Sequence, residues 1–241
     1  MSTLFISDLH LSDNQPGITT LFLHFLNHQA RQAKALYILG DLFETWIGDD
    51  HQTPFNTRII TALKALVASG VTTYFMPGNR DFLIGRRFIQ QTGCHYLPDP
   101  SVIDLYGQSV LLTHGDSLCT LDKNYLRYRR WSRYRLWQSL FLKLPVALRE
   151  KIAHRLRGIE HSITPENKDQ YDVVMSHLFQ CLDQHPNTTL IIHGHTHQPC
   201  IQLIQRESQL IKRFVLSDWQ NSQGNVLVAL PNLNFELVYF S

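Results

Sequence analysis

Five short polar motifs combine carboxylate, amide and imidazole side chains, and an apolar stretch precedes each of them. The motifs are Asp8-Leu9-His10, Gly40-Asp41, Gly78-Asn79-Arg80-Asp81, His114-Gly115-Asp116 and His193-Gly194-His195-Thr196-His197. Oxygen and imidazole ligands suit divalent manganese, iron or zinc, and the lack of cysteine in the motifs argues against a structural zinc site. His195 and His197 are two residues apart, so extended backbone points both rings the same way. Any one motif alone is common in structural roles, whereas the ordered set predicts a divalent-metal site.

The apolar pattern supplies elements that can bring these motifs together. Short strands are predicted at residues 3–7, 35–39, 71–75 and 190–192, and amphipathic helices at 18–33 and 55–70. In layered α/β proteins the loops at the carboxyl ends of the strands converge on one crevice. The five motifs, each directly after a predicted strand, are therefore expected around one point.

The remainder of the chain predicts a single domain over residues 1–241 with one insertion. Residues 102–105 and 109–113 predict a hairpin, and antiparallel strands are predicted at 201–203, 213–216, 225–229 and 235–240. Strand–helix alternation followed by a mostly β tail is typical of an α/β layered domain. Residues from about 122 to 168 break this pattern with a helical stretch rich in Arg, Trp and Tyr, which we interpret as a lid.

The lid segment differs from the rest of the chain in charge. It holds twelve basic and four acidic residues, a net charge of +8, whereas the other residues sum to −6. Such a segment suits nucleic acid, an anionic membrane surface or a plain solvated helix face. The crowded apolar side chains of residues 136–148 favour acyl chains, which would bury them at about 25 cal/mol per Å². Some of these side chains are also expected to pack the lid onto the body.

The bulk composition excludes several other classes of protein. A chain of 241 residues with 44% hydrophobic residues can bury a sizeable core. The four cysteines lack metal-binding spacing, which predicts a reduced, cytoplasmic compartment. The sequence holds no signal peptide pattern and no run of about 18 apolar residues, so no transmembrane helix is expected.

The motif series D-x-H, G-D, G-N-x-D, H-G-D and G-H-T-H resembles that of the calcineurin-like metallophosphoesterase superfamily. Within it, the stretches FISDLHLS, YILGDLFETWIGDD, PGNRDFLIG, THGDSLCT, WQSLFLKLP and HGHTHQP are similar to the UDP-2,3-diacylglucosamine pyrophosphohydrolases of lipid A biosynthesis. The resemblance spans nearly the whole chain. It implies an α/β fold, a four-layer αββα sandwich with a helical lid insertion, and two Mn²⁺ ions per chain.

The resemblance also implies roles for individual residues. Asp8, His10 and His197 would hold one metal, Asn79, His114 and His195 the other, and Asp41 would bridge the two. Catalytic roles fall on Asp41, Asn79, Arg80 and His195, and substrate contacts on Asn79, Arg80, Asp122 and His195. In the tail of the lid the family usually shows Ser, Asn and Lys, where this chain has Glu160, Thr164 and Asn167, followed by Lys168. Thr164 and Asn167 are the substrate contacts expected there.

The implied reaction is attack of water on the α-phosphorus of UDP-2,3-diacylglucosamine, giving UMP and 2,3-diacylglucosamine 1-phosphate. The implied partners are this lipid-linked UDP-sugar and an anionic membrane surface, with neither nucleic acid nor an obligatory protein partner. The implied location is the cytoplasmic face of the inner membrane of a Gram-negative bacterium, by peripheral association.

Arg80 separates this reaction from its alternatives. The wider superfamily usually has His at that position, which can protonate an alkoxide leaving group. A phosphate leaving group has a second pKa of about 6 and needs no proton near neutral pH, so a guanidinium fork serves it better. The alternatives are a phosphodiesterase acting on nucleotides or nucleic acid and a non-catalytic scaffold. A scaffold would be expected to have lost ligands, and all seven are present.

Overall fold

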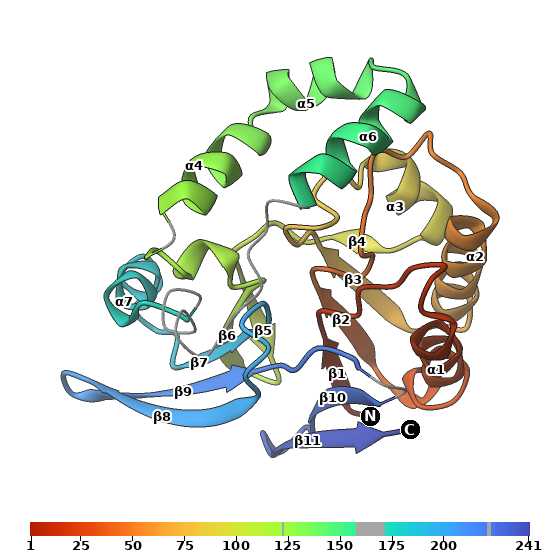
Figure 1. Cartoon of the computed structure of the whole chain (residues 1–241). Coiled ribbons are helices and arrows are strands. Elements are labelled where there is room, and N and C mark those ends of the chain that lie inside the picture. Colours follow the sequence, from red (N-terminus) through yellow and green to blue (C-terminus); the bar gives the residue numbers. More distant parts are fainter. Residues whose placement is uncertain (122, 158–171, 221–222) are drawn as a thin grey trace.

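Two mixed β-sheets form the centre of the computed structural model, which describes residues 1–121, 123–157, 172–220 and 223–241 (Figure 1). The first sheet has the order β11-β10-β1-β2-β3-β4, in which β1, β2, β3 and β4 run parallel. Its strands are β1 (Thr3–Ile6), β2 (Ala35–Leu39), β3 (Thr72–Met76), β4 (His95–Tyr96), β10 (Gly224–Ala229) and β11 (Phe235–Phe240). The second sheet has the order β5-β6-β7-β9-β8, in which β6, β7 and β9 run parallel. Its strands are β5 (Ser101–Leu105), β6 (Gln108–Thr113), β7 (Leu190–His193), β8 (Cys200–Arg206) and β9 (Gln209–Val215).

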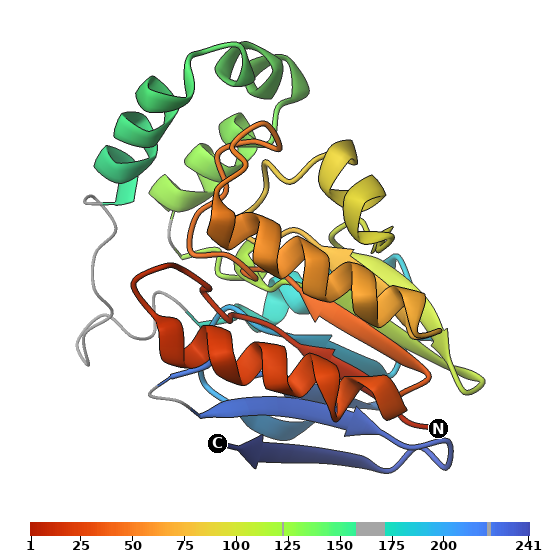
Figure 2. The same cartoon turned by 90° about the vertical axis from the view of Figure 1, so that its right-hand side faces the viewer.

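Helices cover the outer face of each sheet and complete a four-layer αββα sandwich. On the first sheet lie α1 (Pro16–Asn27), α2 (Pro54–Ala68) and α3 (Arg86–Thr92), and Figure 2 shows α1 and α2 side by side over it. On the second lies α7 (Met175–Asp183), which buries Leu178 and Leu182 against Leu111 and Ile191. The fold expected from the sequence is confirmed.

Apolar side chains from both sheets meet in the middle layer. Phe5 and Leu39 from the first sheet share one buried cluster with Leu112 and Ile192 from the second. Each of these side chains is almost completely buried, so the two sheets hold their strand ends in fixed relation. That fixed relation positions the loops that follow β1, β2, β3, β6 and β7.

Three helices occupy the described part of the predicted lid. They are α4 (Lys123–Ser132), α5 (Arg135–Leu142) and α6 (Val146–Arg157). In Figure 1 they arch over the body on the side where β2 and β3 end. Phe141 of α5 is 6% exposed and belongs to the same buried cluster as the α1 and α2 side chains, so part of the lid packs on the body.

The structure differs from the sequence predictions in several elements. The helix expected at 18–33 ends at Asn27 and is followed by a separate 3-10 turn, η1 (Ala30–Gln32). The C-terminal strands are divided, with β8 and β9 in the second sheet and β10 and β11 in the first. The sequence patterns did not predict α3, β4 or α7, which are only 7, 2 and 9 residues long. No helix in the described ranges has the length and apolarity needed to cross a bilayer.

Candidate metal centre

The five motifs follow five strands whose carboxyl ends meet. Asp8, Asp41 and Asn79 come after the parallel strands β1, β2 and β3, and His114 and His195 come after the parallel strands β6 and β7. Backbone hydrogen bonds join the loops directly, from Asp8 N–H to the Gly40 carbonyl at 3.1 Å and from Gly194 N–H to the His114 carbonyl at 2.9 Å. The convergence expected from strand order is thus present.

Six of the predicted ligands form two compact groups. Asp8, His10 and His197 bring one ligand atom each within 4.8 Å of one another, and Asp41, His114 and His195 do the same. The Oδ2 atom of Asp41 lies 4.0 Å from His10 Nε2 and 3.7 Å from His114 Nε2, between the two groups. The geometry therefore offers two adjacent cation sites that share one carboxylate.

Unsatisfied polar atoms show that these groups suit a cation. Among the described residues, Asp8 Oδ1 and His10 Nε2 are buried and make no hydrogen bond. His114 Nδ1 lies 2.9 Å from the Leu39 carbonyl and must donate to it, which in the neutral ring leaves Nε2 as an acceptor. That nitrogen faces Asn79 Oδ1 at 2.8 Å. A divalent ion bound here would displace any proton from these atoms and satisfy them together.

Five of the seven predicted ligands have left-handed backbone. The φ angles of Asp8, His10, Asp41, His195 and His197 lie between 50° and 68°. This region disfavours L-residues by roughly 1–3 kcal/mol each, and such residues persist where the surrounding structure fixes them. The strained backbone occurs at residues whose side chains converge on one point. The need to place these side chains there, rather than local backbone preference, therefore determines their conformation.

Two motif glycines lie where a side chain would collide with the site. A Cβ on Gly78 would lie 2.1 Å from Asp41 Oδ1, and a Cβ on Gly194 would lie 2.2 Å from Asp8 Oδ2. Both collisions are with carboxylates of the predicted ligand set. Because glycine has no side chain, the loop that holds Gly78 or Gly194 can pack directly against the ligand carboxylate of a neighbouring loop.

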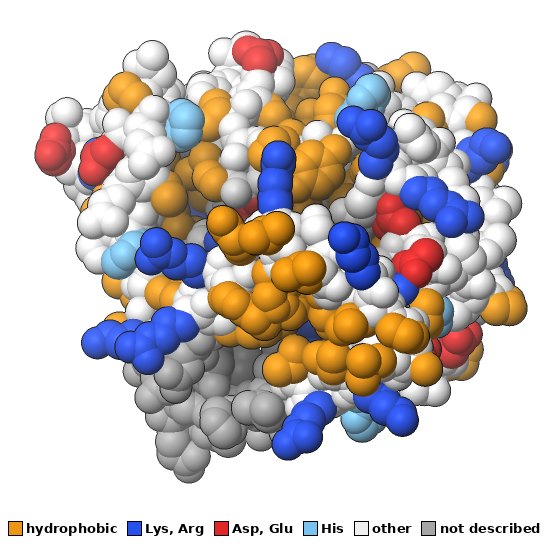
Figure 3. All heavy atoms as spheres, turned by 90° about the horizontal axis from the view of Figure 1, so that it is seen from above, with side chains coloured by type: hydrophobic (Ala, Val, Ile, Leu, Met, Phe, Trp, Pro, Cys, Tyr) orange, Lys and Arg blue, Asp and Glu red, His pale blue; other side chains and the backbone are white. Residues whose placement is uncertain are grey.

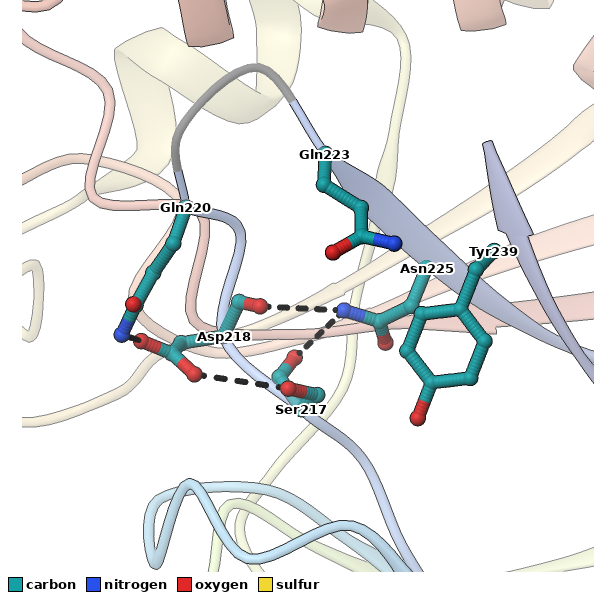
Figure 4. Close-up of a pocket in the computed structure, with 6 residues that line it drawn as sticks. All are labelled: Ser217, Asp218, Gln220, Gln223, Asn225 and Tyr239. Carbon is teal, nitrogen blue, oxygen red and sulfur yellow. Dashed lines mark hydrogen bonds between the residues drawn. The ribbon is translucent and has the colours of Figure 1, made fainter. Parts of the chain in front are cut away.

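Acidic residues outside the predicted set orient two of the imidazoles. Glu44 Oε2 lies 3.1 Å from His10 Nδ1, and Asp218 Oδ2 lies 3.5 Å from His197 Nδ1. Asn225 donates to the Ser217 and Asp218 carbonyls, both at 3.1 Å, and so holds the Asp218 segment against β10 (Figure 4). Carboxylates on the far nitrogen of a metal-binding imidazole fix its orientation and raise its basicity.

His193 lies in the last motif but is already bonded at both ring nitrogens. Its Nδ1 lies 2.8 Å from the Gly194 carbonyl, and its Nε2 accepts from Arg213 Nε at 2.8 Å. Burial and the Arg213 charge lower the pKa of His193 to about 3. It therefore acts as a neutral bridge that supports the loop of His195.

The carboxylates and imidazoles of the centre shift each other's pKa. Burial disfavours the charge of Asp8, yet the His197 imidazole, whose Nε2 lies 3.4 Å from Asp8 Oδ1, and the charge of His114 bring the pKa of Asp8 below the ordinary value. Burial likewise opposes protonation of His10 and His114, but their acidic neighbours raise each pKa to about 9. Burial and the charge of His114 lower the pKa of His195 to about 4. The acidic side chains thus favour positive charge on His10 and His114, as they would favour a bound cation.

Asp81, the last residue of the Gly-Asn-Arg-Asp motif, joins two of the loops. Its Oδ1 accepts from Gly78 N–H and its Oδ2 from Leu42 N–H, both at 2.8 Å, and the side chain is fully buried. Burial and the neighbouring Asp41 charge raise the pKa of Asp81 to about 7.

We expect Asp81→Asn to destabilise the fold by about 1–3 kcal/mol at pH 8, because one buried N–H loses its acceptor. Thermal unfolding measures this effect, with the exposed Asp13→Asn as the control. The two variants should differ in melting temperature, and equal melting temperatures would contradict the bridging role.

Asp116 of the His-Gly-Asp motif ties the centre to the lid. Its Oδ2 accepts from Tyr125 at 2.6 Å and from Arg129 Nε at 2.7 Å, both on α4. Arg129 also donates to Asp99 at 2.9 Å, and Arg133 donates to the Gly78 carbonyl at 2.8 Å. These basic side chains of the lid are therefore engaged inside the protein and are not available to an external surface.

Some expected contacts lie outside the described residues. Asp122, Glu160, Thr164, Asn167 and Lys168 all fall there. Arg80 is described: its N–H donates to Asp41 Oδ1 at 2.8 Å, and its guanidinium lies 3.6 Å from Glu44. The predicted motifs contained Asp81 and Asp116 without assigning them a role, and the available signal was their position two residues after the predicted ligands Asn79 and His114. Glu44 and Asp218 carried no sequence signal.

Comparisons with known proteins agree with this geometry. The model of the calcineurin-like phosphoesterase family matches residues 1–199. A protein of Coxiella burnetii named UDP-2,3-diacylglucosamine hydrolase is 49% identical over 240 residues, which cover 99% of this chain and 97% of that protein. A protein of Pseudomonas paraeruginosa with the same name is 50% identical over 220 residues, 91% of each chain.

Solved structures show the same fold at low sequence identity. A dimetal phosphatase from Danio rerio is 14% identical with a TM-score of 0.53, over 95% of this chain and 92% of that one. An archaeal phosphodiesterase is 12% identical with a TM-score of 0.51, over the full length of both chains. The family implies a divalent-metal centre, which the two ligand groups suit. The chain therefore belongs to the calcineurin-like phosphoesterases and, within them, to the family of the UDP-2,3-diacylglucosamine hydrolases.

Proposed function

We propose that this chain hydrolyses the pyrophosphate bond of UDP-2,3-diacylglucosamine in lipid A biosynthesis, with two Mn²⁺ ions, to give UMP and 2,3-diacylglucosamine 1-phosphate. The observation that carries the proposal is the pair of three-residue ligand groups, of which the second contains Asp41, whose Oδ2 atom also lies 4.0 Å from His10 of the first. The substrate is supported by the names of relatives about half identical to this chain. Hydrolysis of UDP-2,3-diacylglucosamine with Mn²⁺, set beside bis-p-nitrophenyl phosphate and DNA, tests it. Turnover of DNA in preference to the acylated UDP-sugar would overturn it.

The ligand residues have distinct tasks in this reaction. Asp8, His10 and His197 would hold one ion, Asn79, His114 and His195 the other, and Asp41 both. The ions would supply an activated water and neutralise the attacking and leaving oxygens of an in-line displacement at the α-phosphorus. Asn79 and His195 would also contact the phosphoryl oxygens. Tyr125 of α4 stacks on His195 with ring centroids 6.2 Å apart and limits the freedom of that imidazole.

Arg80 is proposed to bind the leaving phosphate. Its backbone is fixed on Asp41, and its side chain, about a quarter exposed, borders the centre beside Glu44. Arg80→Ala should lower kcat/KM on the pyrophosphate substrate by roughly 10- to 100-fold, because a charge-assisted contact worth about 1.5–3 kcal/mol is lost. The loss on bis-p-nitrophenyl phosphate, which lacks the second phosphate, should be smaller.

Arg80→Lys is the matched control for charge. It retains the cation but loses the planar fork, so it should recover part of the rate on the pyrophosphate. Steady-state kinetics on both substrates make the comparison. Equal losses on both substrates in Arg80→Ala would contradict a leaving-group role.

The α5 helix of the lid has two apolar faces with different surroundings. Trp137 and Phe141 stack on each other with centroids 5.0 Å apart and pack toward the body together with Leu144. Leu136 and Leu140, one turn apart, are 62% and 57% exposed. The inward face suits acyl chains lying between lid and body, and the outward face suits a membrane surface.

The outward face is proposed to dock on an anionic membrane. Seen from the lid side, hydrophobic side chains gather in the middle of the molecule with Lys and Arg side chains around them (Figure 3). Three of the twelve basic residues of the lid, Arg129, Arg133 and Arg149, are bound internally, whereas Arg127, Arg130 and Lys143 are exposed. The charge available to a membrane is therefore smaller than the sequence count of +8 suggested.

The double variant Leu136→Ser/Leu140→Ser should lower affinity for vesicles at least tenfold, because each buried leucine contributes about 1.5–3 kcal/mol. Vesicle co-sedimentation with phosphatidylglycerol measures it. Leu203→Ser/Leu210→Ser on the exposed β8–β9 hairpin is the matched control and should bind as the wild type does. If both pairs weakened binding alike, α5 would not be the docking face.

A further inference from the structure

A cavity distinct from the metal centre lies behind α4, on the side of α3 and β4. It measures about 680 Å³ and four arginines line it: Arg86 from α3, Arg129 and Arg133 from α4, and Arg135 from α5. None of the seven predicted metal ligands lines it, and neither does Arg80. The cavity is thus separate from the metal centre, although Arg133 reaches from it to the carbonyl of Gly78, next to Asn79.

The charge of this cavity is positive. Asp99 is the carboxylate among its lining residues, and it is already bound by Arg129 at 2.9 Å and by Thr113 Oγ1 at 2.7 Å. Arg129 and Arg133 are engaged with Asp116 and Gly78. The guanidinium groups of Arg86 and Arg135 are exposed and make no hydrogen bond or ion pair with the described residues. The guanidinium groups of Arg86 and Arg135 are therefore available to bind an anion.

The remaining lining residues supply an apolar floor and a hydroxyl. Phe82 lies under the Arg133 guanidinium, 5.3 Å from ring centroid to Cζ, and Ile84 and Ile89 extend the apolar surface. Tyr96 is 52% exposed and brings a phenol to the same cavity. A volume of 680 Å³ is in the range of small-molecule sites and exceeds that of a bare phosphate. Guanidinium forks bind phosphate oxygens in pairs, and the floor suits an organic substituent.

From this arrangement we propose that the cavity is a second anion site, which takes a phosphate ester. The ester is held by Arg86 and Arg135, with its organic part over Phe82 and Ile84. The same chemistry is offered by a phospholipid headgroup and by a soluble phosphate ester. Because Arg133 and Arg129 join the cavity to the metal loops, an occupant would also hold α4 in place. The proposal does not depend on the identity of the substrate hydrolysed at the metal centre.

The test compares two double variants of the full-length protein. Arg86→Ala/Arg135→Ala removes two lining cations, and Arg87→Ala/Arg130→Ala removes two exposed cations of α3 and α4 that do not line the cavity. Calorimetry measures binding of glycerol phosphate to the Mn²⁺-loaded protein and, in parallel, to the EDTA-treated protein. Co-sedimentation measures binding to phosphatidylcholine vesicles with and without phosphatidylglycerol. Hydrolysis of bis-p-nitrophenyl phosphate checks that every variant retains an intact metal centre.

The Arg86→Ala/Arg135→Ala variant should lose at least about tenfold in affinity for the phosphate ester, and the Arg87→Ala/Arg130→Ala control should lose less than about twofold. A loss confined to phosphatidylglycerol vesicles would identify a lipid headgroup as the occupant, and a loss confined to glycerol phosphate a soluble ester. Equal binding by both double variants in both arms would overturn the proposal. Because the diester assay is independent, that result would leave the proposed hydrolase activity standing.

Discussion

Replacing Asp41 with Asn is expected to lower kcat/KM on any phosphate ester by about a thousandfold or more. The Oδ2 atom of Asp41 lies between His10 and His114, 4.0 Å and 3.7 Å from their Nε2 atoms, so one charge serves both cation sites. Its loss weakens both sites, and an ion that stabilises transition-state charge is worth several kcal/mol. The measurements are hydrolysis of bis-p-nitrophenyl phosphate at limiting Mn²⁺ and the metal content of the purified protein.

The same substitution should leave the fold intact. The other carboxylate oxygen of Asp41 accepts the Arg80 N–H at 2.8 Å, and the amide oxygen of Asn can accept it as well. His10→Ala is the comparison, because it touches one ligand group and should reduce binding of one ion while the other is retained. Near-normal turnover by Asp41→Asn at limiting Mn²⁺ would show that the two-metal assignment is wrong.

Shortening both acyl chains of the substrate by two methylenes each should lower kcat/KM by about two hundredfold. The inward side of α5, α6 and the turn between them offers Trp137, Ile152 and Leu144, partly buried against the core. A buried methylene is worth about 0.8 kcal/mol, so four of them change kcat/KM by that factor. A series of substrates that differ in acyl length, assayed at concentrations below KM, measures the dependence.

Protein variants locate this effect within the molecule. Trp137→Ala and Ile152→Ala should reduce turnover of the acylated substrate while sparing bis-p-nitrophenyl phosphate, which has no acyl chain. Leu210→Ala, an exposed leucine on β9 far from the lid, should change neither rate. Activity independent of acyl length would leave the metal chemistry in place and remove the lipid from the proposed function.

The order of apolar strands and polar motifs was enough to predict where the metal residues would gather. His195 N–H reaches the Asp8 carboxylate at 2.9 Å across 187 positions of the chain, yet the motifs of both residues start directly after predicted strands. Parallel strands end at a common edge of their sheet. The order of strand and motif along the chain therefore indicates which loops meet. The apolar periodicity likewise predicted the layers, because each strand and helix must bury the face on which its apolar residues recur.

The sequence could not show how the acidic residues of the motifs divide their work. In the sequence, Asp81 and Asp116 resemble the predicted ligands Asp8 and Asp41. In the structure, Asp81 accepts hydrogen bonds from N–H groups of the loops, and Asp116 accepts them from side chains of α4. The difference depends on which donors each carboxylate meets in space. Those donors come from residues distant in the chain, so residue type and spacing do not reveal them.

The residue types and their order thus determined the layered fold and the set of side chains that meet, because strand ends and apolar faces are local properties. The tertiary structure alone decided the left-handed backbone of ligands such as Asp8 and His197 and the separation of the lid's basic residues into two groups. Arg129 and Arg133 are bound inside, whereas Arg127, Arg130 and Arg135 of the same segment are exposed. A count of charged residues in the sequence does not show this division, because the burial and pairing of each side chain depend on how distant segments pack.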